Sequence, residues 1–281
     1  MNPFLWTILI VIGLFLLLYI VAMFKRPRSR YKGNMAEQNP MEGKKVRFVV
    51  NENEPENADG MRGHLEAIGD SSHHASVYER MVKRFLDVIL SFGGLVVLSP
   101  VFLVLSIWIF IDDPGPILFA QKRVGRDKQY FMLHKFRSMK MSTPRNIPTH
   151  MLENPEQYIT RAGHFLRSHS LDELPQIWDI FIGNMSIIGP RPALWNQDWL
   201  TACRDEHDAN DIKPGLTGWA QINGRDELEI PVKAKLDGEY VQNIGLKMDI
   251  KCFLGSVGVF VGDKSIVEGG TGEMKKKEQV K

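Results

Sequence analysis

The chain has 281 residues, of which 44% are hydrophobic and 24% charged, and its formal net charge is +2. This length suits one or two domains. The small net charge, with basic residues spread along the chain and no aromatic interleaving, argues against a nucleic-acid partner. The two cysteines, Cys203 and Cys252, form no CxxC motif, so we expect free thiols and no zinc site.

The beginning of the chain is strongly apolar. Pro3–Phe24 is an almost wholly apolar run of 22 residues, which as a helix is about 33 Å long, enough to cross the core of a bilayer. A cleaved signal peptide is the alternative, but no basic segment precedes the run and no small-residue cleavage site follows it. We therefore predict a transmembrane anchor at 1–24. Five basic residues follow at 25–32 and predict that the rest of the chain lies in the cytoplasm.

The next segment, at 25–80, is predicted to be a polar linker that is partly disordered, because Asn, Glu, Gly, Pro and Ser dominate it. A brief strand at 45–50 (KVRFVV) is the exception. At the other end of the chain, the polar and weakly basic residues 266–281 predict a disordered tail.

A second apolar stretch, Phe85–Ile111, is interrupted near its middle by Ser99 and Pro100. A proline inside a helix removes a backbone hydrogen bond and clashes with the preceding turn, so we expect a kink or a break. The stretch is either a kinked span or a re-entrant helix-break-helix that returns to the same face. Re-entry keeps the basic residues on both sides of the stretch in the cytoplasm, and the Ser99 hydroxyl can satisfy a carbonyl freed at the break. We therefore predict a re-entrant membrane segment at 83–111.

The segment SLDE at 170–173 opens a run of apolar residues with helical spacing. Taken alone, Ser170 and Glu173 form a capping box, in which the glutamate reaches back to the serine that caps the helix. The adjacent carboxylates also suit phosphoryl transfer. A helix N-terminus favours ionised carboxylates, Asp172 can attack phosphorus, and Glu173 can hold Mg²⁺. Arginines that can clamp a phosphate flank the dyad at Arg161, Arg167 and Arg191.

Four basic residues after the second apolar stretch are candidates for binding nucleotide phosphate or lipid headgroups, with solvated surface charge as the alternative: Lys122, Arg123, Lys135 and Arg137. The turn Gly189–Pro192 either aims Arg191 or is an ordinary loop. The glycine-rich loop at 213–225 (KPGLTGWAQINGR) has no P-loop or Rossmann fingerprint. It either brings backbone N–H groups and the candidate Arg225 to a phosphate or packs as a structural turn.

Four motifs, in this order, resemble those of the bacterial sugar transferase family, the monotopic polyprenyl-phosphate phosphoglycosyl transferases: KRFLDVILSFGGLVVLSP, KFRSM, SLDELPQIWDIFIGNMSIIGPRP and KPGLTGWAQINGR. The resemblance runs from about Lys83 to Asp249. It implies an α-rich α/β fold with a re-entrant helix-break-helix in one leaflet and a small cytoplasmic catalytic domain with amphipathic interfacial helices, which we assign to 81–265. Many larger relatives have four spanning helices and an extra domain before the transferase core, whereas we predict one anchor and a linker at this position in the present chain.

The resemblance also implies a reaction. Asp172 attacks the sugar-bearing phosphate of a nucleoside-diphosphate sugar, commonly UDP-linked, forming a phosphosugar–aspartate intermediate and releasing UMP. Polyprenyl phosphate then accepts the sugar phosphate, which starts the assembly of exopolysaccharide, capsule or O-antigen. No motif specifies the sugar.

The same resemblance implies that Glu173 coordinates Mg²⁺ and that Arg167 and Arg191 bind phosphate. It also implies attachment to the bilayer of the inner (cytoplasmic) membrane and downstream glycosyltransferases as partners, and a homodimer is compatible with it. Two alternatives to the transferase are a Mg²⁺-dependent hydrolase with water as acceptor and a non-catalytic membrane scaffold.

Overall fold

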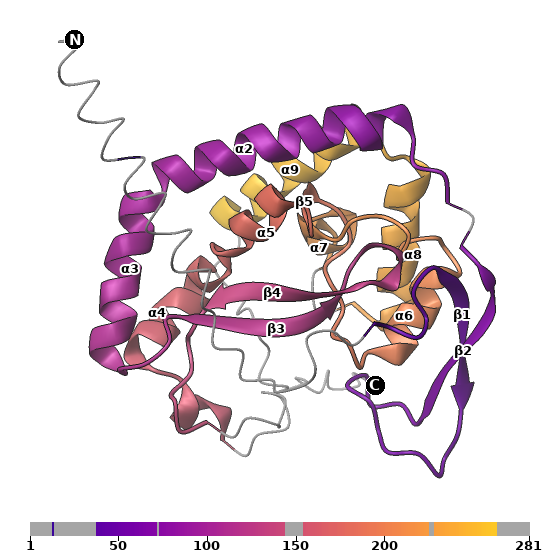
Figure 1. Ribbon diagram of the computed structural model, residues 1–281, viewed down its shortest axis with the longest axis horizontal. Helices are drawn as coiled ribbons and strands as arrows, with labels where there is room; N and C mark the ends of the chain where they lie inside the picture. Colours follow the sequence, from indigo (N-terminus) through magenta and orange to yellow (C-terminus); the bar gives the residue numbers. More distant parts are fainter. Residues whose placement is uncertain (1–12, 14–37, 72, 144–153, 225–227, 263–281) are drawn as a thin grey trace, which may run out of the picture.

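The computed structural model describes residues 13, 38–71, 73–143, 154–224 and 228–262. The predicted anchor (apart from Gly13), the predicted tail and the candidate Arg225 lie outside the described residues. Helices predominate over short strands in the described part of the chain (Figure 1). The prediction of a helix-rich α/β fold is therefore confirmed.

The described elements, in chain order, are β1 Lys44–Val50, β2 Gly63–Asp70, the π-helix η1 Tyr78–Lys83, α2 Arg84–Val97, α3 Ser99–Asp112, β3 Leu118–Val124, η2 Arg126–Lys128, β4 Tyr130–Phe136, η4 Pro155–Tyr158, α4 Arg161–Ser168, η5 Leu171–Glu173, α5 Gln176–Ile182, β5 Ser186–Ile188, α6 Asp198–Asp205, β6 Gly215–Thr217, α7 Trp219–Ile222, α8 Ile230–Gln242 and α9 Leu246–Gly262. The helices η2, η4 and η5 are of the 3₁₀ type. Within the described residues, the strands form three two-stranded sheets, antiparallel for β1–β2 and β3–β4 and parallel for β5–β6.

The segment that precedes the second apolar stretch contains a β-hairpin. Strand β1 confirms the strand predicted at 45–50, whereas its partner β2 was not anticipated by the interpretation of this segment as a linker. Most residues of β2 are exposed, which explains why its composition is typical of a linker. The hairpin packs on α6: the backbone N–H of Val46 donates to Asp205 Oδ2 at 2.8 Å, and the rings of Phe48 and Trp199 meet edge to face at 5.7 Å.

The second apolar stretch forms two helices that meet at a break, as predicted. Among the described residues, no single helix is both long enough and apolar enough to cross a bilayer. Taken together, η1–α2 and α3 have the required length and apolarity, as a pair bent by 59°. Pro100 lies in the first turn of α3, where its missing N–H removes no helical hydrogen bond. The Ser99 hydroxyl donates to the Val96 carbonyl at 2.7 Å, so it satisfies an acceptor at the break.

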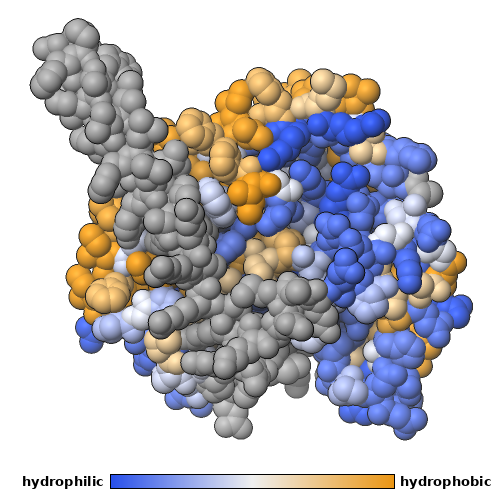
Figure 2. Space-filling model, viewed as in Figure 1, coloured by the Kyte–Doolittle hydropathy of each residue, from blue (hydrophilic) through white to orange (hydrophobic). Residues whose placement is uncertain are grey.

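The bent pair has an inner and an outer face. On the inner face, Leu95 and Phe102 are fully buried against β4 and α4. On the outer face, large apolar side chains are exposed, and Figure 2 shows apolar residues along α2 and α3. The exposed ones include Phe85, Ile89, Phe92, Val97, Val104, Ile107, Phe110 and Ile111. An apolar surface of this extent marks contact with a membrane or another protein.

Polar contacts attach both ends of the bent pair to the same folded body. At the start of α2, Lys83 Nζ lies 2.6 Å from Asp249 Oδ2 of α9. At the end of α3, Asp112 Oδ2 accepts a hydrogen bond of 2.9 Å from the backbone N–H of Ala162 in α4. Both ends of the bent pair are therefore anchored to the same folded body.

Candidate active site

The dyad lies in a tight turn between α4 and α5. Ser170 has a left-handed backbone with φ of 53°, and its side chain makes no capping hydrogen bond. The following helix η5 is a single 3₁₀ turn, and α5 begins only at Gln176. The predicted capping box is therefore wrong: the backbone of Ser170 turns the chain sharply, and the Glu173 side chain is bound by other partners.

Glu173 is almost fully buried between two cations. Its Oε1 lies 2.5 Å from Lys135 Nζ and 2.9 Å from Arg191 Nη2, and its Oε2 lies 3.4 Å from Arg191 Nη1. Burial raises the pKa of Glu173, but the charges of Arg191 and Lys135 outweigh burial and hold the pKa well below its usual range. Glu173 is therefore ionised at neutral pH.

Asp172 is also buried, with 8% of its surface exposed. Its Oδ1 atom has no hydrogen-bond partner within the described part of the chain. Burial raises the pKa of Asp172; Lys135 and Arg167 oppose this effect, and Glu173 adds to it. The sequence predicted that a helix N-terminus would keep the Asp172 carboxylate ionised. That prediction did not take into account that the side chain is buried, which favours its protonated form. A buried acceptor without a partner is costly and is typical of functional sites.

Arg167 lies on the last turn of α4, beside Asp172. Its Nε donates to the Ser138 hydroxyl at 3.0 Å, just after β4. Burial lowers the pKa of Arg167, and the charge of Asp172 opposes that effect. We define the dyad cluster as Asp172, Glu173, Lys135, Arg167 and Arg191. It brings three cations together with two carboxylates, so it is suited to an anionic substrate.

The turn that carries Arg191 is supported by the glycine-rich loop. The backbone N–H of Gly189 donates to the Thr217 carbonyl, and that of Gly215 donates to the Pro190 carbonyl, both at 2.8 Å. A Cβ on Gly215 would lie 2.1 Å from the Gly189 nitrogen, so the strands β5 and β6 can approach this closely only with glycine. In its described part, the loop therefore acts as the structural turn that the sequence left as one of two alternatives.

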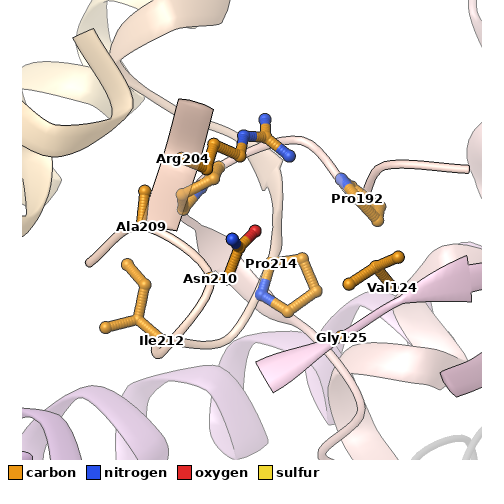
Figure 3. A pocket seen from close by; sticks show the side chains of 9 residues that line it. Val124, Gly125, Pro192, Arg204, Ala209, Asn210, Ile212 and Pro214 are labelled. Carbon is orange, nitrogen blue, oxygen red and sulfur yellow. The ribbon is translucent and has the colours of Figure 1, made fainter. Parts of the chain in front are cut away.

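The turn Gly189–Pro192 is closely packed against its neighbours. A cavity of about 10 Å³ lies behind it, lined by Pro190, Pro192 and Arg204 among others (Figure 3). This volume is no larger than that occupied by about one water molecule. Arg123 Nη1 adds a hydrogen bond of 2.9 Å to the Pro192 carbonyl. The direction of Arg191 is thus fixed by packing as well as by its ion pair.

The other predicted phosphate ligands lie elsewhere. Lys122 Nζ lies 4.0 Å from the centre of the Tyr130 ring and 5.2 Å from that of Trp195. Arg137 contacts Asp113 at the end of α3, through an ion pair of 3.5 Å and a hydrogen bond to the Asp113 carbonyl. Arg123 supports the Arg191 turn, as described above. Of the predicted phosphate ligands, the structure therefore brings Lys135, Arg167 and Arg191 to the dyad.

Sequence reasoning missed two residues that position this cluster. His134 precedes Lys135 on β4, and its backbone N–H donates to Asp179 Oδ2 at 2.9 Å. The His134 ring Nδ1 lies 2.8 Å from Asp179 Oδ1. This buried pair joins β4 to α5 and fixes the strand that presents Lys135. The only sequence signal is the presence of polar His134 and Asp179 in two otherwise apolar segments, and it does not show that they pair.

The side-chain oxygens of the dyad can be compared with the ligands that the predicted Mg²⁺ requires. The described residues contain no group of three or more His, Cys, Asp and Glu side chains that could hold a metal ion. Mg²⁺ commonly uses one or two carboxylates and takes its remaining oxygens from water and substrate phosphates. Asp172 Oδ1 has no partner among the described residues, and the ionised Glu173 is adjacent. The dyad thus fits a Mg²⁺ ion that is bound together with a phosphate.

The described part of the chain thus combines a bent apolar helix pair with a buried carboxylate dyad on which three cations converge, an arrangement suited to an anionic substrate. The comparison with known families is specific: residues 78–263 match the family described as bacterial sugar transferase. This match covers more than half of the chain, so the protein belongs to that family, as the motif order predicted. The hairpin β1–β2 precedes the matched region.

Curated relatives carry related names. The chain is 37% identical over 179 residues to the UDP-glucose:undecaprenyl-phosphate glucose-1-phosphate transferase of Escherichia coli (strain K12), covering 61% of this chain and 38% of the relative. It is 33% identical over 186 residues to the undecaprenyl-phosphate galactose phosphotransferase of Salmonella typhimurium, covering 61% and 38%. It is 35% identical over 182 residues to the exopolysaccharide production protein ExoY of Sinorhizobium fredii, covering 60% and 80%. The first two relatives are thus matched over about two fifths of their length.

Proposed function

We propose that this protein transfers a sugar phosphate from a UDP-sugar to polyprenyl phosphate, as the first membrane step in the assembly of an exopolysaccharide or related glycan. The observation that carries the proposal is Asp172 Oδ1, a buried carboxylate oxygen without a partner among the described residues, within a cluster that contains three cations. The names of the curated relatives support the substrate classes. The product would be consumed by glycosyltransferases.

In the proposed first step, an Asp172 carboxylate oxygen attacks the phosphorus that carries the sugar. A P–O bond forms, the bond to the bridging oxygen of the diphosphate breaks, and UMP leaves with that oxygen. In the second step, a phosphate oxygen of polyprenyl phosphate attacks the same phosphorus. The bond to Asp172 breaks, which restores the carboxylate and yields a polyprenyl-diphosphate sugar.

The surrounding side chains have distinct roles in this proposal. Arg191 and Arg167 bind the diphosphate and offset the charge on the transferring phosphoryl group. Lys135 holds the Glu173 carboxylate and contributes positive charge next to Asp172. Mg²⁺, when bound, would be held by Glu173 and neutralise phosphate charge. Because Glu173 already contacts two cations, it can reach a metal only by loosening one of those contacts.

The lipid acceptor requires access to the membrane, and we propose that the bent pair α2–α3 is re-entrant. Both ends of the pair contact the same folded body, through Lys83–Asp249 and Asp112–Ala162. A full crossing would require this one folded body to extend across the bilayer core, which is about 30 Å thick. Re-entry keeps the dyad on the cytoplasmic face, where UDP-sugars are present, and the exposed apolar side chains of α2 and α3 then face lipid.

The test is a screen of the purified chain with polyprenyl phosphate against a panel of UDP-sugars, measuring UMP release and the labelled lipid product. We expect one UDP-sugar, or a small set, to give a lipid-linked product, and Asp172→Asn to give none. Full activity of Asp172→Asn would exclude the covalent mechanism. Sugar phosphate released into water would indicate a hydrolase, and the absence of turnover with every UDP-sugar would favour a scaffold.

A further inference from the structure

A second concentration of positive charge lies at the base of the bent helix pair. A cavity of about 180 Å³ opens there between η1, the start of α2 and the segments around residues 126 and 213. None of the described residues that line it belongs to the dyad cluster. Five of the lining side chains are cationic: Arg80, Lys83, Arg84, Arg126 and Lys213.

Two acidic side chains also line this cavity, and both have other partners. Asp87 Oδ1 accepts hydrogen bonds of 3.0 Å from the Ser186 hydroxyl and from the backbone N–H of Ile187. Glu79 Oε1 lies 3.2 Å from His73 Nε2. Within the described part of the chain, neither carboxylate forms an ion pair with a cation of the cavity. The two acids therefore reduce the positive charge of the cavity without neutralising it.

The cationic side chains of the cavity differ in whether a negative charge or another acceptor lies next to them. Lys83 is paired with Asp249 at 2.6 Å. Arg84 donates at 2.7 and 2.8 Å to two backbone carbonyls at the end of α5, which bind the guanidinium but carry no full negative charge. The side chains of Arg80 and Lys213 have neither a hydrogen-bond nor an ion-pair partner among the residues that the structure describes. The cavity thus contains cationic groups that can bind an anion.

Two of these cations converge on one point. A Cβ on Gly183 would lie 3.2 Å from Arg84 Nη2 and 3.5 Å from Lys213 Nζ, so both groups approach the glycine that ends α5. Burial lowers the pKa of Lys213; the charge of Arg84 also lowers it, and Asp87 partly opposes them. An anion in the cavity would relieve the repulsion between these like charges.

We propose that this cavity is a phosphate-binding site, distinct from the dyad, in which Arg80, Arg84 and Lys213 hold the phosphate oxygens. Guanidinium and ammonium groups suit phosphate as charge-assisted donors. A volume of about 180 Å³ accommodates a phosphate or phosphodiester group, whereas sites for larger organic ligands occupy roughly 300–1,000 Å³.

The position of the cavity suggests two sources of the phosphate. The first exposed apolar residues of α2, Phe85 and Ile89, follow directly after the cationic residues of the cavity. With α2 in a bilayer, the cavity would lie at the level of the lipid headgroups. The ligand is therefore a phosphate group, either that of a phospholipid or inorganic phosphate from solution. The proposal does not depend on the reaction proposed for the dyad.

The test uses the full chain in detergent and follows its thermal unfolding midpoint during titration. The ligands are inorganic phosphate, with chloride of equal ionic strength as reference, and dioctanoyl phosphatidylglycerol, with dioctanoylglycerol as a reference that lacks phosphate. The cavity variant is Arg80→Gln/Lys213→Gln. The matched control is Lys44→Gln/Arg47→Gln, which removes the same charge from strand β1, on the hairpin.

We expect a saturable rise in the midpoint of the parent with at least one phosphate ligand. The cavity variant should weaken the apparent affinity at least tenfold, and the control variant should behave like the parent. A response to phosphatidylglycerol alone identifies a lipid headgroup, and a response to inorganic phosphate identifies a soluble ligand. No saturable response in the parent, or equal titrations of the cavity and control variants, would overturn the proposal.

Three further variants, each with a single substitution, keep the test valid if the double variant does not fold. Arg80→Gln changes an exposed side chain and should weaken binding alone. Lys213→Arg keeps the charge and should bind like the parent. Normal binding by Arg80→Gln, together with no effect of Lys213→Gln alone, would also contradict the proposal.

Discussion

Lys135 and Glu173 form an ion pair in which Nζ lies 2.5 Å from Oε1, and this pair joins strand β4 to the dyad turn. The neighbouring His134 ties the same strand to Asp179 of α5. The dyad is therefore held from two sides by side chains that are distant in sequence. The glutamate of the dyad is as much a part of this scaffold as a candidate ligand for a metal.

Replacing Glu173 by glutamine should destabilise the fold, because Lys135 and Arg191 would lose their shared carboxylate. Breaking a fully buried pair costs roughly 3–5 kcal/mol. Lys135 and Arg191 are 19% and 30% exposed, so we expect a loss of about 2 kcal/mol in the free energy of unfolding. Urea denaturation measures this loss. Glu66→Gln, which removes an exposed pair with Arg47, is the control, and an equal effect of both changes would contradict the prediction.

Asp172→Asn should have the opposite effect on stability while it abolishes transfer. Burial raises the pKa of Asp172, so the folded state favours the protonated form. The stability that this group contributes is present at low pH and is lost as the pH rises through the raised folded-state pKa. The variant should therefore unfold at a higher temperature than the parent at pH 7, with a smaller difference at pH 4. A variant that is less stable than the parent at pH 7 would refute this expectation.

The raised pKa of Asp172 also predicts a pH dependence of the rate. The carboxylate must be ionised to attack phosphorus, so the rate of UMP release should fall as the pH drops through the raised pKa. The midpoint of this acidic limb should lie above the ordinary aspartate value of about 3.9. Initial rates between pH 4 and pH 8, normalised to folded protein by circular dichroism, measure the limb. A rate that is unchanged down to pH 4 would argue against Asp172 as the nucleophile.

Asp249 holds the base of α2, because it accepts from three side chains: Lys83 at 2.6 Å, Tyr78 at 2.8 Å and Tyr240 at 2.6 Å. Asp249→Asn should cost about 3 kcal/mol in the free energy of unfolding, since it leaves the buried Lys83 without its carboxylate. Chemical denaturation in detergent measures the loss. Asp208→Asn, at the half-exposed pair with Lys45, is expected to cost less than about 1 kcal/mol.

The re-entrant arrangement predicts that positions before α2 and after α3 are accessible from the same side of a membrane. Cysteines introduced at Glu66 and Glu156, which are both substantially exposed, should react with an impermeant maleimide from the cytoplasmic face only. The background should be low, because burial raises the pKa of both native thiols, Cys203 and Cys252, to about 11. Labelling from opposite faces would show that the helix pair crosses the bilayer.

Features encoded by neighbouring residues were predictable from the sequence. The break at Ser99 and Pro100 follows from the geometry of one proline, and strand β1 follows from a run of β-branched and apolar residues. The capping box suggested by the spacing of Ser170 and Glu173 does not form, because the Glu173 carboxylate is held in buried ion pairs with Lys135 and Arg191. Strand β2 was missed because most of its residues are exposed and only its pairing with β1 defines it.

The composition of the dyad cluster was only partly predictable. Arg167 and Arg191 are close to the dyad in sequence, but Lys135 reaches it only because β4 packs beside η5. The basic residues Lys122, Lys135 and Arg137 look alike in the sequence, and the alternation of side chains along a strand does not indicate which face meets the dyad. That choice is made by tertiary contacts such as His134–Asp179.

The hydrophobic core beneath the dyad is shared with the bent helix pair. Leu171, Leu174 and Ile177, on either side of the two carboxylates, pack against the cluster that contains Phe102 and Leu105 of α3. Deleting α2 and α3 would therefore strip the packing from under the dyad turn. The dyad turn is not a detachable unit, and a shortened, water-soluble version of this chain should not retain the geometry at Asp172.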